Sequence, residues 1–260
     1  MAYFLKANAL KTKTVPALCF FVSLSLNFHK MRFYLKIVLL LVSLPVFSQE
    51  KQIESPFVKV DSLYREDQFY FGVTYNRLQK IPAGMSQNGL STTIHLGFLR
   101  DMPINKSRTF AIAAGFGFAY NKYHQNLVVS EIDGTMNYEV VPAGSYATNK
   151  LEEVFMEFPL EIRWRNSTPE SHQFWRIYSG FKLSCLLYSK TKYDGLGQIY
   201  TVINNPDFNK LQYGPYLAMG WNTWNLQLYY GLNSIFKSGE INQQRIEMKT
   251  FNMGLMFYIL

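Results

Sequence analysis

The sequence predicts an all-β protein: a closed eight-stranded antiparallel transmembrane β-barrel with short periplasmic turns and longer extracellular loops. Three observations lead to this prediction. Period-two alternation recurs eight times, the connections alternate between long and short, and the tryptophans gather beside the short connections. No stretch of residues 49–260 is apolar over the roughly 18 residues that would indicate a membrane helix.

The segment 109–121 shows the alternation most clearly. Phe110, Ile112, Phe116 and Phe118 share one parity, and alanines and glycines occupy the other. Successive side chains of a strand point to opposite faces, so one face is apolar and the other nearly bare. We expect eight such strands, at residues 69–77, 90–100, 109–121, 151–165, 173–188, 210–221, 224–233 and 247–260. Each is long enough for a tilted membrane strand, which takes about 9–11 residues.

The connections follow the plan of an outer-membrane barrel. The intervals 78–89, 122–150, 189–209 and 234–246 are long and polar, whereas 101–108, 166–172 and 222–223 are short. Such barrels have short periplasmic turns and longer extracellular loops. An unpaired backbone group in hydrocarbon costs several kcal/mol, so the first strand must pair with the last.

All four tryptophans flank the short connections and have the outward parity. They are Trp164, Trp175, Trp221 and Trp224. Tryptophan favours the membrane interface because its ring is apolar and its N–H requires a partner. We therefore predict that these four residues form half of an aromatic girdle at one rim of the barrel.

The inward parity of the fourth and fifth strands carries charges of both signs. The predicted lumen charge network comprises Glu153, Glu157, Glu161, Arg163, Arg176 and Lys182. A buried charge is costly without a partner, so acids on one strand are expected to pair with bases on the other. A polar conduit or proton relay is one interpretation. Eight strands leave an interior about filled by side chains, which favours a structural salt-bridged plug and no wide pore. Pro159 cannot donate to the ladder, so a bulge is expected near it.

The N-terminal region has the features of a secretory leader. Residues 31–48 have a basic start, an apolar run and a small residue at the expected cleavage point after Ser48. Residues 1–30 are an upstream extension or part of the leader, 49–67 a short periplasmic segment, and 68–260 the barrel. Residues 1–48 hold six Lys or Arg and no acid, so the net charge falls from +8 to +2 without them. The mature charge thus indicates no nucleic-acid partner.

The sequence indicates no enzyme. His124, with Ser130 and Glu131 nearby in a long loop, is the weak alternative, because a lipid-modifying hydrolase would need Ser, His and an acid at the membrane rim. We assign no catalytic, cofactor-binding or metal-binding residue, and we expect no cofactor and no small-molecule substrate. The expected location is the outer membrane, after export through a cleaved signal peptide, with membrane lipid as the immediate partner.

Several segments resemble one family. FVKVDSLYREDQFYFGVTYN (57–76), LGFLRDMPINKSRT (96–109), AIAAGFGFAYN (111–121) and FMEFPLEIRWR (155–165) resemble the PorT/SprT-type outer-membrane barrels of Bacteroidetes, a branch of the small porin-like barrels. The resemblance implies an accessory or assembly role in type IX protein secretion and gliding motility, with other secretion-system proteins as partners. A stand-alone structural or adhesive barrel is the alternative.

Overall fold

The computed structural model describes residues 66–166, 175–195, 197–221 and 224–259, so the expected leader and most of the N-terminal segment lie outside the described residues. The strands, in chain order, are β1 (Glu66–Gln79), β2 (Thr92–Pro103), β3 (Phe110–His124), β4 (Leu127–Ile132), β5 (Thr135–Val140), β6 (Tyr146–Arg165), β7 (Trp175–Gly195), β8 (Gln198–Ile203), β9 (Leu211–Trp221), β10 (Trp224–Tyr230), β11 (Glu240–Ile241), β12 (Gln244–Arg245) and β13 (Lys249–Ile259). In this part of the chain, no helix has the length and apolar character needed to cross a bilayer.

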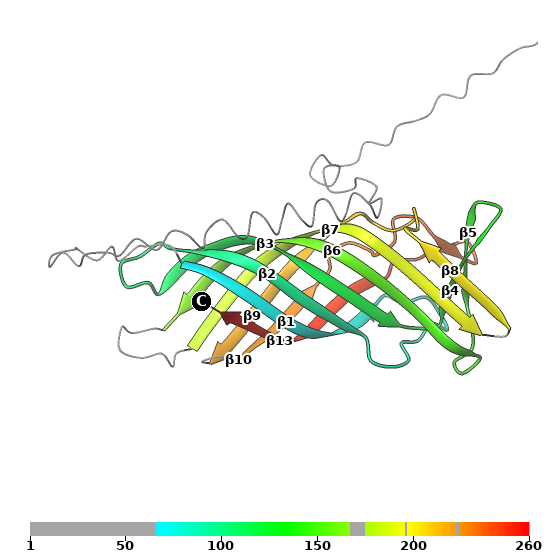
Figure 1. Cartoon of the computed structure of the whole chain (residues 1–260), viewed down its shortest axis with the longest axis horizontal. Helices are drawn as coiled ribbons and strands as arrows, with labels where there is room; N and C mark the ends of the chain where they lie inside the picture. The colour runs from blue at the N-terminus through cyan, green and yellow to red at the C-terminus, as the bar shows by residue number, and fades with distance from the viewer. Residues whose placement is uncertain (1–65, 167–174, 196, 222–223, 260) are drawn as a thin grey trace, which may run out of the picture. The chain divides into compact units, whose positions relative to one another are not determined.

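Eight of these strands pair in a ring. The order of the large sheet is β6-β3-β2-β1-β13-β10-β9-β7-β8 (Figure 1). A further β6–β7 pairing closes the ring, and β8 adds to β7 outside it. The first barrel strand pairs antiparallel with the last, from Phe69↔Ile259 to Gln79↔Lys249. All neighbouring strands of the ring are antiparallel. The all-β antiparallel fold predicted from the alternation is therefore confirmed.

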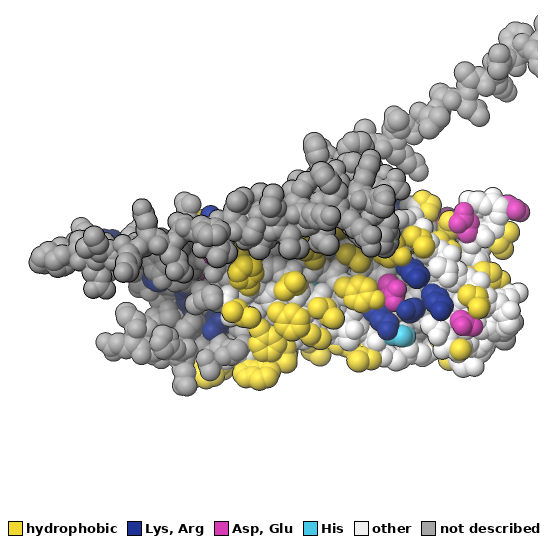
Figure 2. All heavy atoms as spheres, in the orientation of Figure 1, with side chains coloured by type: hydrophobic (Ala, Val, Ile, Leu, Met, Phe, Trp, Pro, Cys, Tyr) yellow, Lys and Arg dark blue, Asp and Glu magenta, His cyan; other side chains and the backbone are white. Residues whose placement is uncertain are grey.

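The alternation separates an apolar outer face from a buried inner face. On β3, Phe110, Ile112, Phe116 and Phe118 are exposed, while the alternating alanines face the lumen and are buried. Figure 2 shows hydrophobic side chains gathered in a band on the visible face. An exposed apolar surface this extensive is typical of contact with lipid rather than water.

The bare inner face of β3 makes room for large side chains from other strands. Tyr70 of β1 lies across Gly97 and Gly117, and a Cβ at either glycine would overlap its ring or hydroxyl. Tyr216 of β9 covers Gly180 in the same way. The glycines thus provide space for aromatic rings that fill the lumen.

Three intervals expected as polar loops contain ordered sheet, and the third, 234–246, holds the short β11–β12 pair. β6 and β7 continue beyond the apolar band and pair as far as Tyr146↔Gly195, and β8 adds to β7. The expected loop 122–150 contains the β4–β5 hairpin, and 189–209 contains the end of β7 and all of β8. The prediction was wrong here because strands that leave the lipid region lose their apolar outer parity, which was the signal used to find them.

The segments at the long-loop end pack around an apolar core, which we call the outer cap. Its buried residues come from five parts of the chain: Leu78, Met85, Tyr123, Leu127, Leu151, Phe208, Ile235, Phe236, Ile246 and Met248. The Tyr138 hydroxyl donates to Asp207 Oδ2 at 2.7 Å and accepts from Asn205 Nδ2 at 2.9 Å. Burial raises the pKa of Tyr138 above its ordinary value, which keeps the hydroxyl protonated and able to donate. The cap is therefore tied together by both apolar packing and hydrogen bonds.

The bulge expected near Pro159 falls elsewhere. The β6–β7 register stays unbroken through Pro159↔Lys182 and shifts between Val154↔Tyr188 and Phe155↔Leu186. On the other side of β6, the register with β3 resumes beyond Pro159 with the same offset, from Ala114↔Leu160 to Gly117↔Glu157. Pro159 lacks a backbone N–H for the ladder, but neither register has an extra residue at this position.

Candidate functional site

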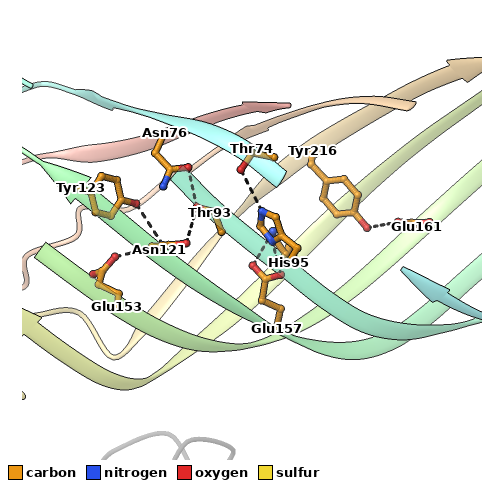
Figure 3. Close-up of polar contacts among 11 residues, drawn as sticks. Thr74, Asn76, Thr93, His95, Asn121, Tyr123, Glu153, Glu157, Glu161 and Tyr216 are labelled. Atoms are coloured by element: carbon orange, nitrogen blue, oxygen red, sulfur yellow. Dashed lines mark hydrogen bonds and ion pairs between the residues drawn. The ribbon is translucent and has the colours of Figure 1, made fainter. Parts of the chain in front are cut away.

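The candidate site is the polar interior of the barrel, built from inward positions of all eight strands of the ring. β6 and β7 supply most of the charges, because Asp, Glu, Lys or Arg side chains recur at the inward positions of both strands. Three groups of contacts follow one another along the lumen. Figure 3 shows the outer group, the contacts of His95 in the middle group and the Tyr216–Glu161 contact of the group nearest the short turns.

The group nearest the short turns is centred on Arg163 of β6, whose side chain is fully buried. Its Nη1 donates to Gln68 Oε1 at 2.7 Å and to Asp101 Oδ1 at 2.9 Å, and its Nε forms an ion pair with Glu161. Arg165 Nη2 lies 3.0 Å from the second oxygen of Asp101. Two acids and two arginines thus neutralise one another, as burial requires.

Aromatic rings complete this group. The Arg163 guanidinium lies 4.5 Å from the ring centre of Tyr178 and 5.3 Å from that of Tyr258. The Tyr216 hydroxyl donates to Glu161 Oε1 at 2.6 Å. Cation–π contacts strengthen when water is excluded, so these rings both fill space and stabilise the buried charge.

The middle group joins β6 to β7 and β2. Lys182 Nζ lies 2.7 Å from Glu157 Oε1, and His95 Nδ1 lies 3.1 Å from Glu157 Oε2. The other ring nitrogen of His95 hydrogen-bonds Thr74 at 3.3 Å. Lys182 Nζ also lies 4.7 Å from the ring centre of Tyr229.

The outer group consists mainly of neutral residues. Thr93 Oγ1 lies 2.7 Å from the Oδ1 atoms of both Asn76 and Asn121. Asn121 Nδ2 donates to Tyr123 Oη at 3.3 Å and to Glu153 Oε2 at 3.4 Å. Among the ion pairs of the described residues, none includes Glu153. Its carboxyl is held by neutral partners instead.

The structure brings some of the six predicted lumen residues together and separates others. Glu157 contacts Lys182 across the β6–β7 pair, whereas the partner of Glu161 is Arg163 on its own strand. Arg176 is partly buried at the short-turn end, opposite Arg165.

Sequence reasoning missed the acid that binds both arginines. Asp101 was placed in a turn, because the second strand was expected to end at residue 100. The strand continues to Pro103, and the inward parity of His95 and Leu99 extends to Asp101. The same parity rule, carried one residue beyond the expected strand end, finds Asp101 at the next inward position after Leu99.

Little empty space remains between these side chains. The cavity bordered by His95, Glu157, Lys182 and Tyr216 has a volume of about 20 Å³, and that beside Asn121 and Gln212 about 10 Å³. A water molecule needs roughly 10–15 Å³ on this measure. The interior thus has room for isolated waters, and chemically it acts as a neutralised, hydrogen-bonded filling.

The four tryptophans lie on the outer face at the short-turn end. Their exposed fractions are 37% for Trp164, 57% for Trp175, 43% for Trp221 and 62% for Trp224. A second set of exposed aromatic side chains lies toward the other end of the strands: Tyr75, Tyr120, Tyr213 and Tyr230. On the two strands that carry both sets, β9 and β10, they are eight and six residues apart, about 20–27 Å before allowing for tilt. A lipid-facing band is about 25 Å tall.

The residues considered for lipid hydrolysis are not assembled into a catalytic arrangement. His124 ends β3 opposite Lys150, whereas Ser130 lies in the β4–β5 hairpin opposite Asn137. Of the hydrogen bonds between described residues, none joins His124 to Ser130 or Glu131. Within the same residues, no three His, Cys, Asp or Glu side chains come together as metal ligands would.

The similarity of the chain to solved structures is remote. No curated protein matches the chain. Among solved structures, the chain is similar to Ail, the attachment invasion locus protein of Yersinia pestis, with a bound heparin analogue (10% identity, 74% of this chain and 97% of that chain, TM-score 0.32) and alone (9%, 74%, 97%, TM-score 0.30). It is also similar to a mutant porin of Rh. blastica (9%, 76% of this chain and 100% of that chain, TM-score 0.18). TM-scores this low carry no functional information.

The family comparison is more direct. The family described as outer membrane protein beta-barrel domain matches residues 47–237, most of the ring. That match agrees with the closed antiparallel strands, the lipid-facing band and the polar filled lumen. The chain belongs to the outer membrane protein beta-barrel domain family and is an outer-membrane protein.

Proposed function

We propose that this protein is a non-conducting outer-membrane barrel that serves as an accessory or assembly component of the type IX protein secretion machinery. The filled lumen is the observation that supports a non-conducting barrel, because the cavities between its described side chains have volumes of only about 20 and 10 Å³. Cargo that crosses the membrane needs a wider path, so the role is to hold or assemble partners. The PorT/SprT-type resemblance of segments 57–76 and 96–109 supports the secretion system as the setting.

The outer cap offers a surface for such a partner. β8 lies at the end of the sheet order, so one of its edges has no ladder partner in the large sheet. A groove of about 420 Å³ lies beside it, lined by Glu131, Asp133, Gly134 and residues 199–202. Ile199 is 68% exposed and Ile132 is 55% exposed. A free strand edge beside apolar side chains is suited to binding an extended segment of another protein.

A gene deletion tests the proposed role. We expect secreted cargo to accumulate in the periplasm of the deletion strain while the outer membrane stays intact, and the wild-type gene to restore secretion. Ile199→Lys should fail to restore it, because the substitution places a charge in the proposed contact surface. Ile104→Lys is the matched control, since Ile104 has a comparable exposed fraction of 60% but lies in the short β2–β3 turn.

A separate measurement tests the filled lumen. Purified protein in a planar bilayer should show no stable single-channel conductance. Steady ion conductance by the folded protein would contradict a non-conducting barrel whatever the deletion strain does.

A stand-alone structural or adhesive barrel is the second candidate, favoured by the ordered cap with its exposed isoleucines. It predicts normal secretion in the deletion strain and altered surface binding. Normal export of every secreted protein in that strain would therefore replace the first proposal with this one.

A further inference from the structure

A compact group of charged side chains lies on the outer face of β3, β6 and β7, just beyond the apolar band. Figure 2 shows Lys or Arg side chains gathered beside the hydrophobic band, with an acidic side chain and a histidine among them. We call this group the basic cluster; it comprises Lys122, His124, Lys150, Glu152, Lys190 and Lys192.

The strand register places these six side chains in a two-by-three grid. Lys122 pairs with Glu152, and Glu152 with Lys190, which forms the row nearer the band. His124 pairs with Lys150, and Lys150 with Lys192, which forms the row farther out. Neighbouring strands are about 4.8 Å apart and alternate residues about 7 Å, so the grid measures roughly 10 by 7 Å. This is the size of a single phosphorylated headgroup.

The cluster directly borders the apolar band. Two residues before Lys122 on the same face is Tyr120, which is 40% exposed and belongs to the tyrosine set at the outer end of the band. Opposite it in register are Val154 and then Tyr188. Because the short turns of such barrels lie in the periplasm, the basic cluster is at the depth of the headgroups of the outer leaflet.

Positive charge exceeds negative charge in the cluster. One ion pair lies within the cluster among the described residues: Lys150 Nζ is 2.6 Å from Glu152 Oε1. Four lysines face this one acid, and the next acid on the same face is Asp194, opposite Thr148. Lys150 and Lys192 are directly opposite each other, an arrangement that is destabilising for like charges unless an anion lies between them.

We propose that the basic cluster binds the phosphate groups of a phosphorylated lipid headgroup in the outer leaflet. Lysine ammonium groups bind phosphate as point charges. The acyl chains of the same lipid lie against the apolar band below Tyr120. A lipid is favoured over a free anion because the cluster joins the hydrocarbon-facing surface without a break. The inference rests on the outer-membrane location and is independent of any role in secretion.

Lipid binding by the purified, full-length mature protein tests the proposal. The variant has four substitutions, Lys122→Gln, Lys150→Gln, Lys190→Gln and Lys192→Gln. The control removes the same charge elsewhere, through Lys80→Gln, Lys106→Gln, Lys210→Gln and Lys237→Gln, all at exposed positions. The probes are bis-phosphorylated lipid A, the same lipid after dephosphorylation, and inorganic phosphate. The readouts are lipid retained after detergent purification, by mass spectrometry, and the shift in thermal midpoint on adding each probe.

We expect wild type and control to retain phosphorylated lipid A and the cluster variant to bind it at least tenfold more weakly. Dephosphorylated lipid should bind all three proteins equally weakly, and raised salt should weaken wild-type binding. Equal retention by cluster variant and control would overturn the proposal, as would a full midpoint shift produced by inorganic phosphate alone. Glu152→Gln removes the one acid of the grid and provides a second check. This variant should bind the phosphorylated lipid more tightly than wild type does. Weaker binding would contradict the proposal even if the fourfold variant did not fold.

Discussion

Removal of one partner from the central ion pair should destabilise the barrel strongly. Lys182 Nζ lies 2.7 Å from Glu157 Oε1, and both side chains are only 5% exposed. Lys182→Met retains much of the volume but leaves the Glu157 carboxylate with His95 as its remaining polar contact, 3.1 Å away. Breaking a buried pair in this way costs about 3–5 kcal/mol, whereas removing both charges together is often close to neutral.

The double variant Glu157→Gln/Lys182→Met separates these two effects. The glutamine oxygen still accepts from His95, so the double variant should lose only about 1–2 kcal/mol. It should thus recover roughly 1–4 kcal/mol of the loss caused by Lys182→Met. Urea unfolding in lipid vesicles, followed by tryptophan fluorescence, measures each free energy. Lys106→Met, an exposed lysine beside a short turn, should stay within about 0.5 kcal/mol of wild type. A loss below about 1 kcal/mol for Lys182→Met, or additive effects in the double variant, would refute the ion-paired filling.

Three further outcomes follow from the geometry. Gly97→Ala should destabilise the barrel by about 1–3 kcal/mol in the same unfolding assay, because the new methyl group meets the Tyr70 ring. In a Tyr70→Ala background the same change should have little effect. Tyr138→Phe should remove about 1–2 kcal/mol from the outer cap, so limited proteolysis of the cap should speed up while gel mobility of the unboiled barrel stays unchanged. The fluorescence of the four rim tryptophans should be quenched more by lipids brominated near the headgroup than by lipids brominated at the chain ends; the opposite order would place them near the bilayer centre.

The lumen illustrates how far period-two reasoning extends. Parity alone placed Glu157 and Lys182 on the same inward face of adjacent strands, because the side-chain period of a strand is two whatever surrounds it. Parity could not predict which of the inward charged residues pair with one another. Glu161 bonds Arg163 on its own strand and Tyr216 on β9, and these contacts depend on strand tilt and on rotamers that no alternation pattern encodes.

The outer cap marks the limit of the sequence signal. Residues 122–150 and 189–209 are polar along the chain, yet they contain the β4–β5 hairpin and β8. Leu127, Phe208 and Phe236 are separated by tens of residues and are buried together only because the barrel brings the ends of its strands to one rim. A few apolar residues in a polar segment have no periodic signature, so their common core could not be predicted.

The sequence by itself determined that the strands are antiparallel, amphipathic and closed into a ring, because hydrocarbon on one side and a filled lumen on the other require a strict alternation that can be read residue by residue. The tertiary structure alone decided which charges neutralise one another, how tightly the interior is filled and which segments form the outer cap. Those properties depend on distances between side chains far apart in the chain, and such distances are set by strand register and tilt.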